Sequence, residues 1–322
     1  MDKVTGIDVS KATLDVAYFE GNKWYQQVLS NDVKGYKALL RLSGQDSWFV
    51  MEASGPYYLR LAMFLKAHGA KVSVVNPLVI KRFSQMRLIR AKTDRKDAKT
   101  IAQYAMVEKP KRWHVAQETI LKMQQMITAL QAVTKQMTMT KNQLGAFKDS
   151  GIIDSQVKKS LNSILKNLQQ QAQKLEDALS RQALQQYAQS MKLLTSIPGI
   201  GSKTAALLIV ITDNFQKFSH YKQLIAFVGF SPRIYESGTS VKGKGHICKM
   251  GNNLVRKVLY LCSWSAKKAT IACAQMYERL KQKGKPEKVI KVAIANKLLK
   301  QAFAIATSGV PYEKNYTAKP CF

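Results

Sequence analysis

The feature that most restricts the fold of this chain is a long segment without proline in its middle. No proline occurs between Pro110 and Pro198, and the segment is rich in Gln, Lys, Leu and Met. Because proline interrupts helices, its absence here permits helices much longer than the average in globular domains. Residues in this segment also recur at alternating three- and four-residue steps, the heptad spacing of helices packed along a seam. The first seam comprises Ile120, Met123, Ile127, Leu130, Thr134, Met137, Lys141 and Leu144, and the second Val157, Leu161, Ile164, Leu168, Gln171 and Leu175.

The two seams predict a long α-helical coiled-coil hairpin over residues 113–190. Lys148-Asp149-Ser150-Gly151 lies between them and has the composition of a turn. Polar residues interrupt both seams, so the pattern does not fix how many helices associate. A plain helical bundle inside a larger domain is the alternative interpretation.

Residues 1–112 alternate short β-rich runs with amphipathic segments, which predicts an α/β domain. The first three expected strands are joined by loops too short for parallel crossovers, so they should form an antiparallel meander. A helix separates the fourth and fifth strands, which makes them parallel. This order predicts a ribonuclease H-like domain. The strands are expected at Val4–Val9, Leu14–Phe19, Trp24–Val28, Ser47–Met51 and Val72–Val75, and the helices at Val33–Leu42, Tyr57–His68 and from Thr93 onward.

Residues 191–322 are expected to form a mainly α-helical C-terminal domain with a strongly basic composition. The chain from residue 190 onward holds 22 Lys and Arg against five Asp and Glu, a surplus of +17. The run from Leu194 to Ala205 resembles a helix-hairpin-helix motif. Gly199 and Gly201 would let backbone N–H groups approach a nucleic-acid phosphate, and Lys203 would add charge. The alternative is a glycine-rich turn between two packed helices.

The net charge of the whole chain, +31, points to a polyanionic partner. Nucleic acid is the first candidate and an anionic membrane surface the second. The longest apolar run, Ala205 to Ile211, has seven residues, far short of the ~18 of a membrane-spanning helix. With no signal-peptide pattern at the start and four cysteines that form no CxxC pair, the sequence predicts a cytoplasmic protein with reduced thiols.

Four carboxylates of the first segment predict a metal centre. Asp8 lies inside an apolar strand, where a charge is costly unless a cation compensates it, and Glu52 ends another apolar run. Asp94 and Asp97 are three residues apart, which places both on one face of a helix that Thr93 can cap. In a ribonuclease H-like fold these elements meet at one edge of the sheet, where the four side chains could hold two Mg²⁺ ions.

The sequence also predicts roles for the residues near these carboxylates. Lys92, Arg95 and Lys96 flank the acidic pair and are expected to bind the nucleic-acid backbone. Asp15, on the next strand, is expected to face solvent.

Several motifs closely resemble the DEDD transposases of the IS110 insertion-sequence family. In the first segment these are Gly6-Ile7-Asp8-Val9-Ser10-Lys11, Glu52-Ala53-Ser54-Gly55 and the run from Lys92 to Ala98. In the last segment they are Ile197-Pro198-Gly199-Ile200-Gly201, Phe230-Ser231-Pro232-Arg233, Ser237-Gly238 and the run from Lys249 to Arg256. They occur in the family's order and cover nearly the whole chain.

The resemblance implies an RNA-guided DNA recombinase of a bacterial insertion sequence, acting on the nucleoid. In that family a RuvC-like domain supplies the acidic quartet, and a C-terminal transposase domain supplies a serine nucleophile, which corresponds to Ser237. A structured bridge RNA pairs with donor and target DNA. The protein is then expected to act as a dimer or tetramer on double-stranded DNA through a 5′-phosphoserine intermediate.

The residues around Ser237 are compatible with that role. Lys242, Lys244 and Lys249 follow it and could neutralise a phosphate during attack. Judged from the residues alone, a phosphate-binding loop in which Ser237 and Ser240 only donate hydrogen bonds remains open. Two other functions also remain open: a structure-specific endonuclease that uses metal-activated water on branched DNA, and a non-catalytic nucleic-acid-binding protein.

Overall fold

The computed structural model describes residues 3–44, 46–89, 93–233, 236–237, 241–242 and 245–313. It consists of two compact units, Met1–Val115 and Ala116–Phe322. The segment predicted as the separate domain 113–190 shares a hydrophobic core with the residues that follow it. The division into domains 1–112, 113–190 and 191–322 stays a prediction.

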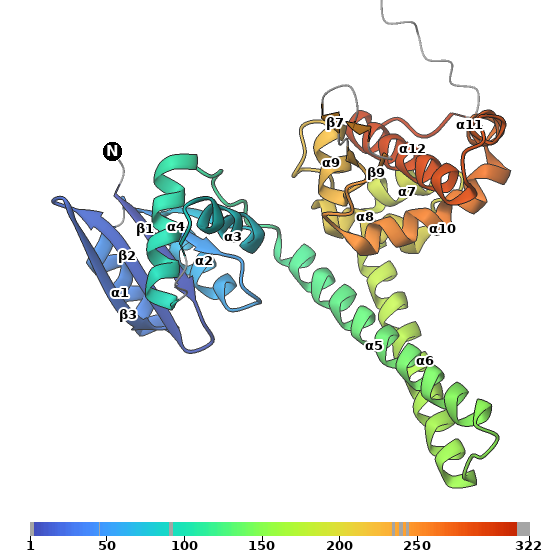
Figure 1. Ribbon diagram of the computed structural model, residues 1–322, viewed down its shortest axis with the longest axis horizontal. Helices are drawn as coiled ribbons and strands as arrows, with labels where there is room; N and C mark the ends of the chain where they lie inside the picture. The colour runs from blue at the N-terminus through green and yellow to red at the C-terminus, as the bar shows by residue number, and fades with distance from the viewer. Residues whose placement is uncertain are drawn as a thin grey trace, which may run out of the picture. The chain divides into compact units, whose positions relative to one another are not determined.

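The first unit is built on a five-stranded sheet in the order β3-β2-β1-β4-β5 (Figure 1). β1, β2 and β3 are antiparallel neighbours, whereas β4 pairs in parallel with both β1 and β5. The expected antiparallel meander of the first three strands is confirmed, and so is the parallel direction of the fourth and fifth. The strands are β1 (Val4–Val9), β2 (Thr13–Glu20), β3 (Lys23–Ser30), β4 (Trp48–Glu52) and β5 (Lys71–Val75).

Helices cover both faces of this sheet. α1 (Val33–Ser43) and α2 (Tyr58–Ala67) pack through Leu39, Leu61 and Leu65 against one face. α3 (Pro77–Met86) and α4 (Asp94–Glu108) pack against the other through Ile80, Ile101 and Ala105. α3 is not among the helices expected from the sequence, although Asn76 caps its first turn and Pro77 occupies its first position, both ordinary helix-start signals.

α4 lies directly on β1 because Gly6 has no side chain. A Cβ on Gly6 would collide with the backbone of α4, at the carbonyl oxygen of Ala98 and the nitrogen of Ala102. This close approach brings the first turn of α4 to the carboxyl end of β1, where Asp8 lies.

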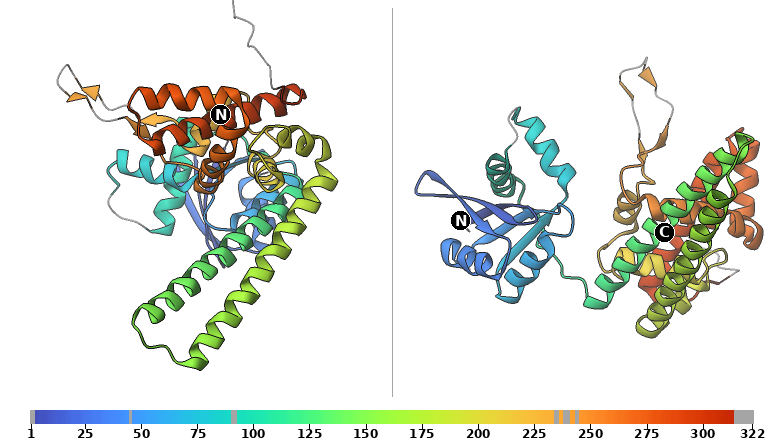
Figure 2. Two further views of the ribbon diagram at one scale, coloured as in Figure 1. Left: turned by 90° about the vertical axis from the view of Figure 1, so that its right-hand side faces the viewer. Right: turned by 90° about the horizontal axis from the view of Figure 1, so that it is seen from below.

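The second unit begins with two 32-residue helices, α5 (Glu118–Asp149) and α6 (Ser155–Gln186). They pack side by side as a hairpin, as Figures 1 and 2 show. Gly151 takes a left-handed φ of 76° in the expected turn, and Asp154 caps α6. At the base of the hairpin Ile120, Met123 and Leu179 join the main core, and Leu144 is buried toward the other end of α5.

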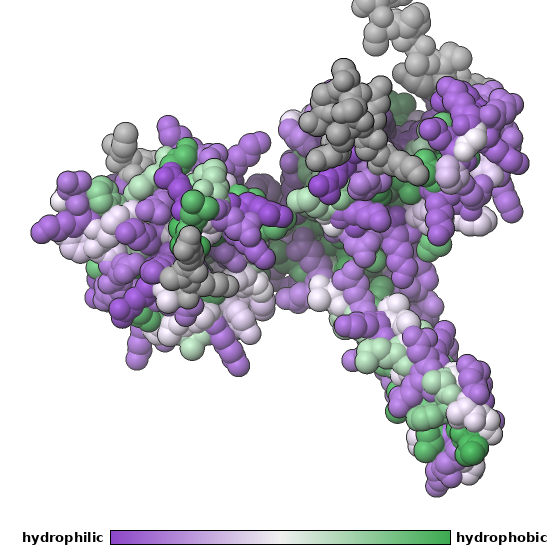
Figure 3. All heavy atoms as spheres, in the orientation of Figure 1, coloured by the Kyte–Doolittle hydropathy of each residue, from purple (hydrophilic) through white to green (hydrophobic). Residues whose placement is uncertain are grey.

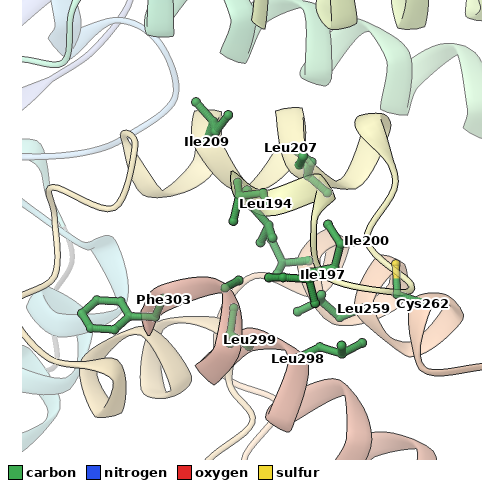
Figure 4. Packing of buried hydrophobic residues seen from close by; sticks show 14 of the residues in the cluster. Leu194, Ile197, Ile200, Leu207, Ile209, Leu259, Cys262, Leu298, Leu299 and Phe303 are labelled. Carbon is green, nitrogen blue, oxygen red and sulfur yellow. The ribbon is translucent and has the colours of Figure 1, made fainter. Parts of the chain in front are cut away.

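The rest of the second unit is a helical cluster whose core is shown in Figure 4. Two short β pairs, β6 with β9 and β7 with β8, project from it between α9 and α10. The helices are α7 (Ala188–Thr195), α8 (Ser202–Thr212), α9 (Tyr221–Val228), α10 (Asn253–Ala269), α11 (Ile271–Gln282) and α12 (Glu287–Ser308). The strands are β6 (Pro232–Arg233), β7 (Glu236–Ser237), β8 (Val241–Lys242) and β9 (His246–Ile247).

Candidate active site

Three adjacent strands place carboxylates in a row at one end of the sheet. Asp8 of β1 is in register with Asp15 of β2. On the other side of β1, Ile7 pairs with Met51 of β4, so Glu52, the next residue of β4, lies beside Asp8. Since alternate residues of a strand share a face, Asp8 points to the same face as Gly6, which is the face under α4.

The first turn of α4 supplies two more carboxylates, Asp94 and Asp97. Thr93 is the N-cap residue, and its side-chain oxygen accepts a hydrogen bond of 3.3 Å from the backbone N–H of Lys96. Asp8, Asp94 and Asp97 each offer a carboxylate oxygen, and these three oxygens lie within 4.8 Å of one another. The structure therefore brings three of the four predicted ligands together, with Glu52 on the neighbouring strand.

This arrangement raises the pKa of Asp8 from 3.8 to about 6. Burial is the largest cause, and repulsion from Asp97, Asp94, Glu52 and Asp15 follows in that order. Gathered carboxylate oxygens are the donor set that hard divalent cations prefer. The residues present fit a divalent metal ion.

Asp15 is buried, so the prediction that it faces solvent is wrong. Its side chain is buried, with 8% exposure. Burial raises the pKa of Asp15, repulsion from Asp94 raises it further, and the nearby Arg95 lowers it. Asp15 is therefore a fifth carboxylate beside the centre. The sequence signal for this burial is a charged residue between two apolar ones, Leu14 and Val16, both of which are buried. Which face of the sheet Asp15 occupies is set by the register of β2 with β1.

The basic residues expected near this centre are only partly described. Arg95 and Lys96 are exposed on the first turn of α4. The backbone carbonyl of Arg95 accepts a hydrogen bond of 2.9 Å from the side-chain amide of Gln26 on β3. Lys92 lies outside the described residues.

Ser237 stands on a small β pair in the second unit, where its backbone is in register with Val241. Its partner strand β8 carries Lys242. Lys244 and the alternative serine, Ser240, lie outside the described residues. Lys249 is exposed just after β9, and its backbone N–H donates a 3.1 Å hydrogen bond to the carbonyl of Gly229.

Lys249 borders a pocket of about 350 Å³ at the start of α10. Three cationic side chains line this pocket, and its floor is partly apolar. The lining residues are Phe230, Ile247, Lys249, Asn253, Arg256, Lys257, Tyr260 and Val292. Such a lining suits a phosphate group.

The predicted helix-hairpin-helix turn joins α7 to α8, and Gly199 has a packing role in it. Gly199 adopts a φ of 99°, and a Cβ there would lie 2.9 Å from the Cβ of Ala266 on α10. Gly201 is the N-cap residue of α8, and a Cβ there would meet nothing within 4 Å. Lys203 forms an ion pair with Glu176 of α6. Phosphate binding by Gly199, Gly201 and Lys203 stays a prediction.

Comparison with known families matches the chain to two models in the order of its two units. A DEDD transposase model of IS110 elements, described as "Transposase", matches residues 5–150. A second model, described as "Transposase IS116/IS110/IS902 family", matches residues 191–278. Together the two models span more than half of the chain. The chain belongs to the IS110 family of transposases.

Two relatives of this transposase match nearly its full length, and a third matches about half of it. It is 27% identical over 316 residues to the pilin gene-inverting protein of Moraxella lacunata, covering 96% of this chain and 97% of the relative. The Moraxella bovis protein of the same name is 27% identical over 318 residues, with the same coverage. An uncharacterised 43.6 kDa protein of insertion element IS110 from Streptomyces coelicolor is 29% identical over 159 residues, covering 49% of this chain and 38% of the relative.

Among solved structures, the transposase matches one titled "T. thermophilus RuvC in complex with Holliday junction substrate". The TM-score is 0.27 and the identity 14%, over 35% of this chain and all of that chain.

Family membership makes this chain a DNA transposase or recombinase, an enzyme that binds DNA. The DEDD class implies use of a divalent metal, which agrees with the cluster of Asp8, Asp94 and Asp97. In the described part of the transposase, no helix is sufficiently long and apolar to cross a bilayer.

Proposed function

We propose that this transposase is an RNA-guided DNA recombinase that cuts and exchanges strands through a phosphoserine at Ser237, with two Mg²⁺ ions held by its acidic quartet. The observation that carries the proposal is the convergence of Asp8, Asp94 and Asp97 at one end of a sheet whose next strand ends in Glu52. In a chain of the IS110 family, a centre of this kind serves DNA phosphodiester chemistry.

Each residue of the quartet has a definite task. Asp8, Glu52, Asp94 and Asp97 would hold the metal through carboxylate oxygens on two strands and one helix. Mg²⁺ bound there neutralises the scissile phosphate and stabilises the leaving 3′ oxygen. Thr93 fixes the start of the helix that carries two of the four ligands. Arg95 and Lys96, exposed beside them, would contact the DNA backbone.

Ser237 would supply the nucleophile. Its hydroxyl oxygen bonds to the scissile phosphorus, the bond from phosphorus to the 3′ oxygen breaks, and the 3′ oxygen leaves as a hydroxyl while the serine proton passes to a base or solvent. A 3′-hydroxyl of the partner DNA then attacks the phosphoserine and releases Ser237. The serine belongs to the second unit and the quartet to the first, so the reaction requires both to reach one phosphate, from one subunit or from two.

Nucleic acid would be gripped by the basic residues of both units. The surplus of +17 from residue 190 onward is suited to DNA and to a structured guide RNA, which present the same phosphate chemistry. The pocket bordered by Lys249, Arg256 and Lys257 offers one place for a backbone phosphate. Sequencing the RNA that copurifies with the protein tests guide binding: recovery of only random cellular RNA would refute it.

The helical hairpin would join subunits into a dimer or tetramer. Away from its base it exposes apolar side chains, seen as green spheres toward its far end in Figure 3. The exposed apolar residues of this part of the hairpin include Met139 at 62%, Ile152 at 84% and Ile164 at 49% exposure. Sedimentation of a variant lacking residues 135–169, which keeps the buried base, should show a smaller assembly; unchanged sedimentation would contradict this role.

The decisive experiment separates a serine nucleophile from water. Ser237→Ala should abolish cleavage while DNA binding is retained, and Ser240→Ala is the matched control that should still cleave. With wild type, denaturing gels of labelled DNA should show a covalent adduct that peptide mapping places on Ser237. An adduct on Ser240 would reassign the nucleophile. Cleavage by Ser237→Ala without any adduct would instead favour a junction nuclease that uses metal-activated water.

A further inference from the structure

The first turn of α4 has little apolar packing to hold it in place. Thr93, Asp94, Arg95 and Lys96 are all exposed, and the buried face of the helix begins only at Ala98. Yet this turn carries Asp94 and Asp97, whose carboxylates must face Asp8. Their orientation therefore depends on polar contacts at the start of the helix.

Two of those contacts come from the edge strand β3. The side-chain amide nitrogen of Gln26 donates a hydrogen bond of 2.9 Å to the backbone carbonyl of Arg95. One turn further, the ammonium of Lys99 lies 4.9 Å from the ring centroid of Trp24. Gln26 and Trp24 are two residues apart on β3 and so share one face of the sheet.

The two contacts lie on the flank of α4 that faces β3, whereas Ala98 and Ala102 lie over Gly6 of β1. The buried face of α4 packs over β1, β2 and β4, whereas the contacts from β3 are side-chain contacts made to the exposed start of the helix. That packing places the body of the helix, but it does not reach the exposed first turn, residues 93–96, on which the hydrogen bond from Gln26 acts.

We propose that Gln26 is a positioning residue of the centre, because it fixes the rotation of the first turn of α4 and thereby aims Asp94 and Asp97 at Asp8. The inference rests on the divalent-cation site of the proposed function. A carboxylate about 5–6 Å from the helix axis moves by about 1 Å for each 10° of rotation. Mg²⁺ requires near-octahedral geometry at about 2.0–2.1 Å, so a displacement of that size weakens binding.

Gln26→Met tests this role, because methionine has the same length but no N–H donor. The matched control is Gln27→Met: Gln27 is also exposed on β3, but it points to the opposite face of the sheet. Calorimetric titration of each full-length protein with Mn²⁺ gives the metal affinity directly. Loss of the hydrogen bond should weaken Mn²⁺ binding about three- to tenfold in Gln26→Met and leave Gln27→Met like wild type.

Two further readouts separate positioning from general damage. In the metal-free protein, amide exchange at residues 96–99, the first hydrogen-bonded amides of α4, should be faster in Gln26→Met, with the rest of the unit unchanged. Saturating Mg²⁺ should restore most of its DNA cleavage rate. Wild-type Mn²⁺ affinity in Gln26→Met, or equal weakening in both variants, would overturn the inference. If wild type itself bound no Mn²⁺, the metal centre of the proposed function would fall as well.

Discussion

Asp8 illustrates at the residue scale how a functional side chain can oppose folding. It is partly buried among Asp97, Asp94, Glu52 and Asp15, and its pKa rises from 3.8 to about 6. Because the folded-state pKa is above that of the unfolded chain, the metal-free fold is favoured when Asp8 is protonated. That stabilisation is present below about pH 4 and is lost as the pH rises through about 6.

We therefore expect Asp8→Asn to stabilise the first unit in the absence of metal. Above pH 7 its melting temperature should exceed that of wild type by about 2–8 °C. Thermal melts with and without Mg²⁺ measure this, and Mg²⁺ should stabilise wild type but not the variant. Asp46→Asn, an exposed position before the opposite end of β4, is the control. If Asp8→Asn were less stable than wild type at pH 7 without metal, the destabilising effect assigned to the Asp8 charge would be contradicted.

At the scale of elements, close backbone approaches at glycines bring the helices to their partners. Gly6 lets α4 lie on β1, and Gly199 lets the turn between α7 and α8 lie against α10. The second contact gives the glycine-rich motif a packing role, in addition to the phosphate binding that the sequence predicts.

Comparison of two glycine variants separates these roles. Gly199 has a φ of 99°, and Gly199→Ala would place a Cβ 2.9 Å from the backbone nitrogen of Ala266. The free energy of unfolding should therefore fall by about 1–3 kcal/mol. Gly201→Ala, with open space around its Cβ, should change stability by less than about 0.5 kcal/mol. Denaturant unfolding measures both. Equal stability of the two variants would contradict the packing role of Gly199.

At the scale of the whole molecule, the net charge of +31 should dominate binding to nucleic acid. Each neutralised phosphate releases counterions, so the logarithm of affinity for duplex DNA falls with the logarithm of salt by about 0.9 per contact. With at least about six contacts, the slope should be about −5 or steeper. Lys249→Ala should make it shallower by about one contact. A wild-type slope shallower than about −2 would mean that the charge serves another purpose.

The sequence by itself predicted the strands and their directions, the two long helices, and the acidic residues Asp8, Asp94 and Asp97 that the structure brings together. Loop lengths distinguish antiparallel from parallel neighbours, and heptad spacing marks a helix face, so these features are local. Charged residues inside apolar runs identified Asp8, and a helix-start pattern identified Asp94 and Asp97, without knowledge of their neighbours.

Only the tertiary structure decided that Asp15 is buried, that Gln26 reaches α4 and that Gly199 packs on α10. In each case the deciding partner is distant in the sequence. The pattern of a strand gives alternating sides but not which side another element will cover. The exposure of a side chain and the partner of a polar group depend on register and on the rotation of a packed helix, which form only when the elements assemble.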